Sequence, residues 1–493
     1  MKKPGIFVVL NILLSALLCA FSVNFDDYFI DRTMRIDYFH TGDAKEDLIA
    51  IDLIYQQGIW AGSKQNLTDT FDNGRYSIKV YNFASKKLIF SKGFDSYFGE
   101  YKTTDLALRG IKRTYHESAL IPYPKEKVLF TIEARNRENL LQPLFSQEID
   151  PHGMAIVKES LKGGVQVLKV VENGDSHQKV DVAFIGEGYT LQEWKKFKSD
   201  VERCAKILFK QEPYKTCKDR FNVYGVLKPS QESGCDEPSH GVFKNTPLNA
   251  SFDALGSERY LLTEDNRSLR DIAAHVPYDA LLIMVNHTRY GGGGIYNLYC
   301  TFTVDSDWHE YLMIHEFGHS FAGLADEYYT SSVAYNEFYP RGVEPREPNI
   351  TALLDRENLK WKDLATAGIE IPTPWEKDSF DKMDTAYQQL RGEVNEKIAR
   401  LKREGAPEKK VKEAEKESAL LSWKHTKSVA EFLRKSKFWG MVGAFEGAGY
   451  SAKDLYRPMV DCIMFTKSAN EYCKVCERAV NRMIHFFTSG KEQ

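Results

Sequence analysis

The sequence has little net charge and no dominant basic patch. Its 66 lysines and arginines nearly balance 69 aspartates and glutamates, so the formal net charge is −3 over 493 residues. Proteins that bind nucleic acid usually carry a basic excess or a clustered basic face. We therefore exclude a nucleic-acid partner.

Long apolar runs are missing after the N-terminus. A membrane-spanning helix needs about 20 apolar residues, and no segment beyond residue 22 has such a run. Residues 1–22 carry two lysines, an apolar run from Ile6 to Leu18 and the small-x-small site Ala20-Phe21-Ser22. This order is typical of a cleaved secretory signal. We expect an exported protein, periplasmic, cell-surface or secreted, without a membrane span.

Cys19 offers an alternative route to the cell surface as a lipidated cysteine. The residue before such a cysteine is normally small, and here it is Leu18. We therefore favour cleavage over lipoprotein anchoring.

Cysteines are few and, in the mature chain, odd in number. Without Cys19, seven of the eight remain, so at least one thiol is free or used differently in an oxidising compartment. Cys473-x-x-Cys476 together with Cys462 fits a structural metal cluster, a disulfide with a spare thiol, or a redox motif. Export favours the disulfide, and the connectivity stays open.

Repeats and a serine-nucleophile motif are also absent. No fixed-period repeat and no G-x-S-x-G elbow occur in the sequence. A solenoid architecture and a serine hydrolase of that kind are therefore not supported.

The front of the chain alternates apolar and polar residues with a period of two. At 493 residues the chain has room for two or three domains. Short alternating runs at residues 76–80 and 128–132 are typical of strands with one buried face. We predict an N-terminal antiparallel β-sandwich domain over residues 23–155, with a role in scaffolding or substrate docking.

From residue 156 the pattern changes to strands alternating with helices. The sequence predicts apolar strands at residues 180–185, 221–227 and 280–285. It predicts a helix at residues 191–209, between the first two strands. We predict an α/β catalytic domain over residues 156–493. Four glycines, Gly291 to Gly294, precede an expected edge strand over Ile295–Val304. They favour either a flexible loop or a backbone that approaches something closely, such as an extended peptide pairing with the edge strand.

A charged helical hairpin is expected within this domain, over residues 376–436. Apolar residues keep near-heptad spacing, and Gly405-Ala406-Pro407 interrupts them. Its charged residues are typical of a helix face exposed to solvent. The alternative is that the hairpin acts as a lid or as a partner-binding surface.

The most specific motif is HEFGHSFAGLADEYY, from His315 to Tyr329. Residues four apart share one helical face, so His315 and His319 can bind one metal ion. A zinc site with an open position uses three protein ligands, and the third is Asp326 or Glu327. Because Gly323 suits a helix stop that turns the chain back, we choose Asp326.

Zinc held in this way predicts hydrolysis by a metal-activated water. The ion lowers the pKa of bound water from about 15.7 to roughly 7, and Glu316 is placed to act as general base. The sequence therefore predicts Zn²⁺ as cofactor, a protein or peptide substrate, and cleavage without a covalent intermediate. It leaves the oligomeric state open.

Other interpretations of the motif remain. The match could be a chance one, or belong to a host-protein or glycan-binding module whose metal site is structural or vestigial. A zinc amidase acting on cell-wall peptide would use the same chemistry. A structural site needs no general base and usually has a fourth protein ligand, so Glu316 favours an enzyme.

Several stretches resemble the IgA-peptidase family of zinc metallopeptidases. They are VDVAFIGEGYT (180–190), YGGGGIYN (290–297), the zinc motif, VGAFEGAGY (442–450), YRPMVDCIM (456–464) and, matching that family's N-terminal domain, MRIDYFHTGD (34–43) and GFDSYFGEYKTTDLA (93–107). The resemblance implies a metzincin-like catalytic domain behind the sandwich. It also implies His315 and His319 as metal ligands, Glu316 as the catalytic glutamate and the Asp326-Glu327 pair as the acidic end. It does not fix the substrate.

The same resemblance implies a methionine beneath the metal, for which Met464 is the first candidate and Met459 the second. Thr466 stands where some metzincins have a tyrosine that assists the oxyanion. Some relatives pair a C-x-M with a C-x-x-C and complete a second zinc site with further cysteines. Because this chain has too few cysteines for that, we expect no second zinc site.

Overall fold

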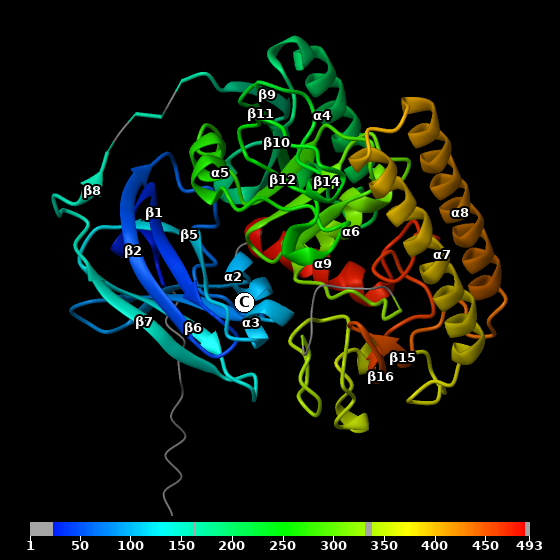
Figure 1. Ribbon diagram of the computed structural model, residues 1–493. Coiled ribbons are helices and arrows are strands. Elements are labelled where there is room, and N and C mark those ends of the chain that lie inside the picture. The colour runs from blue at the N-terminus through cyan, green and yellow to red at the C-terminus, as the bar shows by residue number, and fades with distance from the viewer. Residues whose placement is uncertain (1–22, 159, 162, 331–337, 489–493) are drawn as a thin grey trace, which may run out of the picture.

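Figure 1 shows the computed structural model, which describes residues 23–158, 160–161, 163–330 and 338–488. The predicted signal and Cys19 lie outside the described residues. Within those residues, no helix has the length and apolar character needed to cross a membrane.

The N-terminal region is rich in β structure, as predicted, and contains two four-stranded sheets. One has the order β5 (Arg113–Pro124), β1 (Phe29–Gly42), β2 (Asp47–Gln57), β8 (Ile156–Val157). The other has the order β4 (Leu88–Phe94), β3 (Tyr76–Asn82), β6 (Val128–Arg135), β7 (Leu141–Ile149). All pairs are antiparallel except β2 with β8. The short helices of this region are α1 (Phe25–Tyr28), α2 (Tyr97–Tyr101) and α3 (Asp105–Leu108).

One apolar core joins these two sheets. Ile36 and Ile54 from the first sheet share it with Ile78 and Phe130 from the second. Strand residues at alternate positions point to the same face, which is why the period-two pattern of the sequence produces a single buried layer.

The second region is a mixed α/β domain built on a six-stranded sheet. Its strand order is β13 (Gly292–Ile295), β14 (Tyr299–Thr303), β12 (Ala280–Val285), β10 (Val180–Glu187), β11 (Phe221–Leu227), β9 (Gln166–Val171). The four inner strands are parallel and the two edge strands antiparallel. The three strands predicted from continuous apolar runs are all present, as expected for strands buried on both faces.

Helices cover both faces of this sheet (Figure 1). One face packs against α4 (Trp194–Leu208), α6 (His309–Ala322) and α9 (Lys474–Thr488). The other packs against α5 (Asn266–Ala273) and against aromatic residues of α2. Short 3-10 helices lie in the connections: η1 (Ser176–Gln178), η2 (Leu191–Glu193), η3 (Lys218–Arg220), η4 (Pro238–His240), η5 (Ala254–Gly256), η6 (Arg356–Asn358) and η7 (Lys362–Leu364).

The prediction of an edge strand over Ile295–Val304 is wrong. The chain turns at Asn297, which has a positive φ of 56°, a conformation that asparagine tolerates better than most residues. Residues 299–303 form the inner strand β14, and the glycine run itself supplies the edge strand β13. The flexible-loop interpretation of the glycines is therefore wrong as well.

The charged segment forms two antiparallel helices, α7 (Lys377–Arg403) and α8 (Glu408–Arg434), which lie along one side of the molecule (Figure 1). Gly405 ends the first with a positive φ of 62°. A two-stranded ribbon follows, β15 (Phe445–Ala448) with β16 (Ser451–Arg457).

The two regions contact each other through specific polar bonds. Arg35 Nη1 lies 2.7 Å from Asp271 Oδ1 of α5. The Asn297 side chain donates to Gly93 O at 2.7 Å, and Asp95 N donates to Tyr296 O at 2.9 Å. The N-terminal region is thus fixed next to the turn that joins β13 to β14.

Candidate active site

The first part of the motif, from His315 to Ala322, lies on α6, a helix buried along most of its length. Gly323 ends it in the left-handed conformation (φ 62°), and its backbone N–H bonds back to His319 O at 3.0 Å. This is the helix stop that the sequence predicts. One helical turn separates His315 from His319, and their Nε2 atoms lie 3.2 Å apart.

The other ring nitrogen of each histidine faces a backbone carbonyl. His315 Nδ1 lies 2.9 Å from Ile463 O, and His319 Nδ1 lies 2.6 Å from Leu324 O. A carbonyl oxygen only accepts, so each Nδ1 carries a proton, and in the neutral imidazole that binds a metal each Nε2 presents a lone pair. Two lone pairs that face each other repel unless a cation lies between them.

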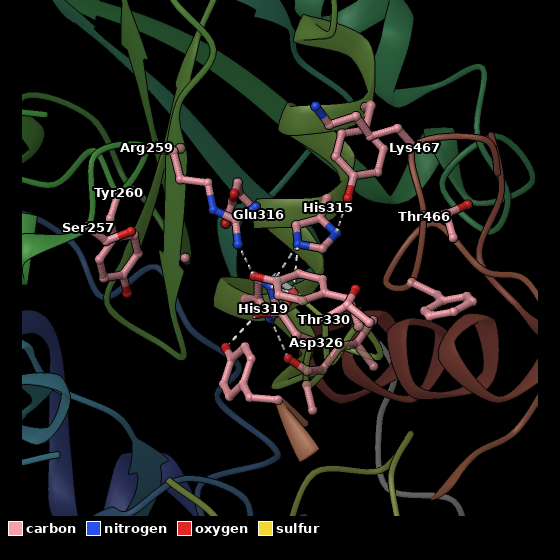
Figure 2. A pocket seen from close by; sticks show the side chains of 18 of the residues that line it. Ser257, Arg259, Tyr260, His315, Glu316, His319, Asp326, Thr330, Thr466 and Lys467 are labelled. Atoms are coloured by element: carbon pink, nitrogen blue, oxygen red, sulfur yellow. Dashed lines mark hydrogen bonds and ion pairs between the residues drawn. The ribbon is translucent and has the colours of Figure 1, made fainter. Parts of the chain in front are cut away.

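Asp326 completes this group. Its Oδ1 lies 3.0 Å from His315 Nε2 and 3.3 Å from His319 Nε2 (Figure 2). Zinc bonds of about 2.0–2.2 Å to nitrogen and oxygen in a tetrahedron place neighbouring ligand atoms about 3.3–3.5 Å apart. The three atoms therefore form a triangle close to one face of a zinc coordination shell.

The charges of these residues are complementary. Burial lowers the pKa of His319, but the Asp326 carboxylate more than offsets it and raises that pKa to about 9. Burial raises the pKa of Asp326, yet the two histidines outweigh it and hold that pKa well below its ordinary value. The carboxylate is thus positioned to stabilise a positive charge at the histidines.

Tyr450 holds the second oxygen of Asp326. Its hydroxyl donates to Asp326 Oδ2 at 2.5 Å, which leaves Oδ1 turned to the histidines. The stretch VGAFEGAGY contains Tyr450, but nothing in the sequence gives this residue a role. The contact joins residues 124 positions apart, so no local pattern reveals it.

Glu327 points away from the histidines. Its side chain is fully buried, and its Oε1 lies 3.3 Å from Cys476 Sγ and accepts from Asn349 Nδ2 at 3.0 Å. Neighbouring residues in extended backbone face opposite sides. Asp326 therefore faces the histidine pair and Glu327 does not.

The segment Cys462-Ile463-Met464 lies beneath α6. Ile463 O bonds to His315, and Met464 O accepts from Glu327 N at 2.8 Å. A Cβ atom added to Gly318 would lie 3.1 Å from Met464 Sδ, so this methionine packs under the helix between the two histidines. Met459 is only partly buried at the edge of the same core.

Glu316 faces a cavity of about 180 Å³ (Figure 2). Burial raises the pKa of its carboxyl above the ordinary value, although the two histidines lower it. Arg259, Lys467 and Thr466 line the same cavity, and Arg259 Nη2 lies 3.1 Å from the hydroxyl of Tyr328. Burial holds the pKa of Lys467 well below its ordinary value, so the cationic donor that the cavity brings close to the histidine pair is the Arg259 guanidinium.

The glycines of β13 allow this strand to lie directly against α6. A Cβ atom on Gly292 would lie 2.9 Å from Glu316 Oε1, and one on Gly294 would lie 2.8 Å from the Cβ of His319. A side chain at either position would collide with the site, because real Cβ atoms do not approach so closely. The close-approach interpretation of the glycine run agrees with this geometry.

The helical hairpin forms part of the cavity wall. Tyr387 and Arg391 of α7 and His425 and Val429 of α8 line it. The rings of Tyr387 and His425 stack with their centres 3.8 Å apart. One side of the hairpin therefore faces the site, and whether it acts as a lid stays a prediction.

Two family models match the chain. One, described as IgA Peptidase M64, matches residues 168–484, and the other, described as Peptidase M64 N-terminus, matches residues 24–146. Together they cover both regions of the fold, including the zinc motif and the hairpin. No curated protein shows significant similarity to the chain.

Proposed function

Since the chain belongs to the IgA peptidase M64 family, we propose that it is an exported zinc-dependent endopeptidase. The membership itself makes the chain a peptidase that acts on proteins or peptides. Zinc as the metal, the roles of individual residues and export are our proposals.

One observation carries the proposal. The Nε2 lone pairs of His315 and His319 face each other at 3.2 Å, and Asp326 Oδ1 lies within 3.3 Å of both. These three residues would hold the ion, with Asp326 rather than Glu327 as the third ligand. Zinc bound there would supply Lewis acidity and activate a water molecule for attack on a peptide carbonyl.

The chain's own residues would perform the proton transfers. Glu316 lies one residue from His315 and opens onto the cavity, so it would accept the proton of the attacking water and pass it to the leaving amine. Arg259 and Tyr328 are joined by a hydrogen bond on the cavity wall. They would donate hydrogen bonds to the oxyanion. Thr466, which stands where some metzincins have a tyrosine, has no ring hydroxyl for this role.

The substrate would bind as an added strand along β13. Strand β13 is the edge of the six-stranded sheet, and Gly292 already bonds outward to backbone at Arg259 and Leu261. Because main-chain groups of alternate residues point to the same side, Gly294 also directs its N–H and C=O outward, into the cavity. An extended peptide can pair there with its scissile bond near Glu316.

Finer features of the fold belong to the same proposal. We infer that the N-terminal region is a β-sandwich that extends the predicted range 23–155 by the two residues of β8 (Ile156–Val157), which pair with β2. The rest of the predicted range 156–493 would form a metzincin-like domain with the hairpin at 376–436 as an insertion. Met464 would be the methionine beneath the metal. Export would depend on residues 1–22, which an intact-mass measurement of the secreted protein tests by locating the cleavage site.

Metal analysis and peptide-library cleavage test the function. We expect the wild type to contain zinc and cleave peptides, and Glu316→Ala to keep the zinc and lose cleavage. Glu310→Ala is a matched control, because Glu310 lies on the same helix with an exposed side chain. Loss of cleavage in the control, or equal cleavage by wild type and Glu316→Ala, would overturn the assignment. Cleavage of cell-wall peptides alone would indicate the amidase instead.

A further inference from the structure

We propose that Glu327, Cys462, Cys473 and Cys476 form a second, closed metal site that binds a structural zinc ion; these four residues are called the cysteine cluster below. Their ligand atoms all lie within 4.8 Å of one another. All four side chains are buried, with no residue more than 4% exposed. Three come from the C-terminal part of the chain, and Glu327 comes from the end of the zinc motif.

The spacing within the cluster matches a metal shell and not a disulfide. Cys462 Sγ and Cys476 Sγ lie 3.8 Å apart, whereas bonded sulfurs lie about 2.05 Å apart. Two thiolates on one tetrahedral zinc, with Zn–S bonds of about 2.3 Å, are about 3.8 Å apart. Cys476 Sγ and Glu327 Oε1 lie 3.3 Å apart, close to the value of about 3.5 Å for a sulfur and an oxygen on the same ion.

The disulfide interpretation of these cysteines is therefore wrong for the structure. All seven cysteines from Cys204 onward are free and buried within the described residues. A redox role does not fit either, since reactive cysteine pairs are partly exposed, whereas Cys473 is 4% and Cys476 0% exposed. Of the three alternatives open from the sequence, the metal cluster remains.

The surroundings of the cluster favour thiolates and a cation. The backbone N–H groups of Met464 and Cys473 point at Cys462 Sγ, with N···S distances of 3.5 and 3.2 Å. Such donors stabilise a charged sulfur more than a neutral one. Among the described residues, Glu327 Oε2 is buried without a hydrogen-bond partner. A buried carboxylate oxygen of this kind calls for a cation.

The donor set identifies the ion. Thiolates select soft or borderline metals such as zinc, and a shell of four protein ligands without an open position is typical of a structural site. Three thiolates and one carboxylate around Zn²⁺ carry a net charge of −2. The buried guanidinium of Arg457 interacts electrostatically with Glu327 and offsets part of that charge. The expectation of no second zinc site counted only cysteines and missed the carboxylate.

The ion would stabilise the positions of the residues that form the active site. Cys462 begins the segment whose Ile463 O orients His315, and Glu327 follows Asp326 directly. Glu327 N also donates to Met464 O at 2.8 Å. Zinc in the cluster would therefore join the two chain segments that position His315 and Asp326.

Metal counting in variants tests the site without using activity. In the folded variant His315→Ala/His319→Ala, which lacks the proposed catalytic ligands, we expect one zinc per chain. X-ray absorption at the zinc edge of this variant should give three sulfurs and one oxygen. Absence of zinc from the folded variant, a shell without sulfur, or a Cys462–Cys476 disulfide detected by mass spectrometry would overturn the proposal.

Substitutions within the cluster provide the matched comparison. In the same background, Cys473→Ser should lower zinc affinity at least tenfold, whereas Cys204→Ser, at a buried cysteine outside the cluster, should retain the ion. Glu327→Cys should replace the carboxylate by a fourth thiolate and retain zinc with four sulfurs. Retention of zinc with an unchanged sulfur count in Glu327→Cys would also overturn the site. Because the catalytic histidines are absent here, failure of this test leaves the proposed peptidase activity untouched, and the reverse also holds.

Discussion

Two sites lie on opposite sides of the Asp326-Glu327 pair and differ in their access to solvent. The proposed histidine site offers three protein ligands and opens onto a cavity of about 180 Å³. The proposed site in the cysteine cluster offers four potential ligands, all buried. If both sites hold zinc as proposed, the two neighbouring carboxylates would have opposite roles, because the number of protein ligands and the access of water decide whether a bound metal is catalytic or structural.

Metal removal should separate the two sites most strongly. Under native conditions a chelator should remove the zinc of the open site and abolish cleavage, with little change in melting temperature. The zinc of the cysteine cluster should leave only when the protein unfolds, because no water reaches it. Metal content measured with and without denaturant checks this. Simultaneous loss of both ions from the folded protein would erase the proposed difference.

Glu316→Gln should have the next largest effect, and only on the open site. Loss of a general base typically costs about 10²–10⁴-fold in rate, while both zinc ions and the melting temperature should remain unchanged. Steady-state kinetics and metal analysis measure these quantities, with Glu310→Gln as the control. A rate within tenfold of the wild type would remove Glu316 from the mechanism.

Tyr450→Phe should weaken the open site less severely. Its hydroxyl fixes Asp326 Oδ2, and loss of such a partner typically costs 10–100-fold in metal affinity or activity. Zinc competition titrations should show this loss at the open site and none at the cysteine cluster. Tyr456→Phe, on the same β15–β16 ribbon, serves as the control. An equal effect of both substitutions would point to general destabilisation.

Substitution of His40 should have the smallest effect on either metal site. Both ring nitrogens of this histidine face carboxylates. Nδ1 lies 2.9 Å from Glu117 and Nε2 lies 2.5 Å from Asp47, which Lys102 also contacts. Burial lowers the pKa of His40, but the carboxylates raise it to about 9. This imidazolium is satisfied without a metal, in contrast to His315.

Because the folded-state pKa of His40 lies above the unfolded value of about 6.5, its stabilising contribution is full below pH 6.5 and is lost as the pH rises through about 9. At pH 7 these two pKa values correspond to a contribution of roughly 2–3 kcal/mol. Chemical denaturation of wild type and His40→Gln at several pH values should show a difference that shrinks over this range, with cleavage at neutral pH unchanged. A difference independent of pH would mean that His40 is neutral in the fold.

The sequence predicts the parts of the fold that depend on local patterns. Continuous apolar runs locate β10, β11 and β12, and Gly323 locates the end of α6. The edge strand is misplaced because a single left-handed residue, Asn297, divides an apolar stretch that otherwise resembles one strand.

The candidate site is predictable only where its residues lie close in sequence. His315, Glu316 and His319 share one helix, so their spacing alone predicts that they lie together. Tyr450 and the cysteine cluster depend on contacts between segments more than 100 residues apart. Spacing within the chain cannot show that Glu327 lies beside the three cysteines.

The strand of glycines beside the site has a consequence for selectivity. Gly292 and Gly294 offer a bound peptide only main-chain groups. Strand β13 can therefore select for the direction and extended conformation of a peptide, but not for the identity of its side chains. Any preference for particular side chains must then come from the opposing surfaces, of which Tyr387 and Arg391 of the hairpin are part. If the substrate pairs with β13 as proposed, exchanging the hairpin between relatives would be expected to alter which sequences are cut.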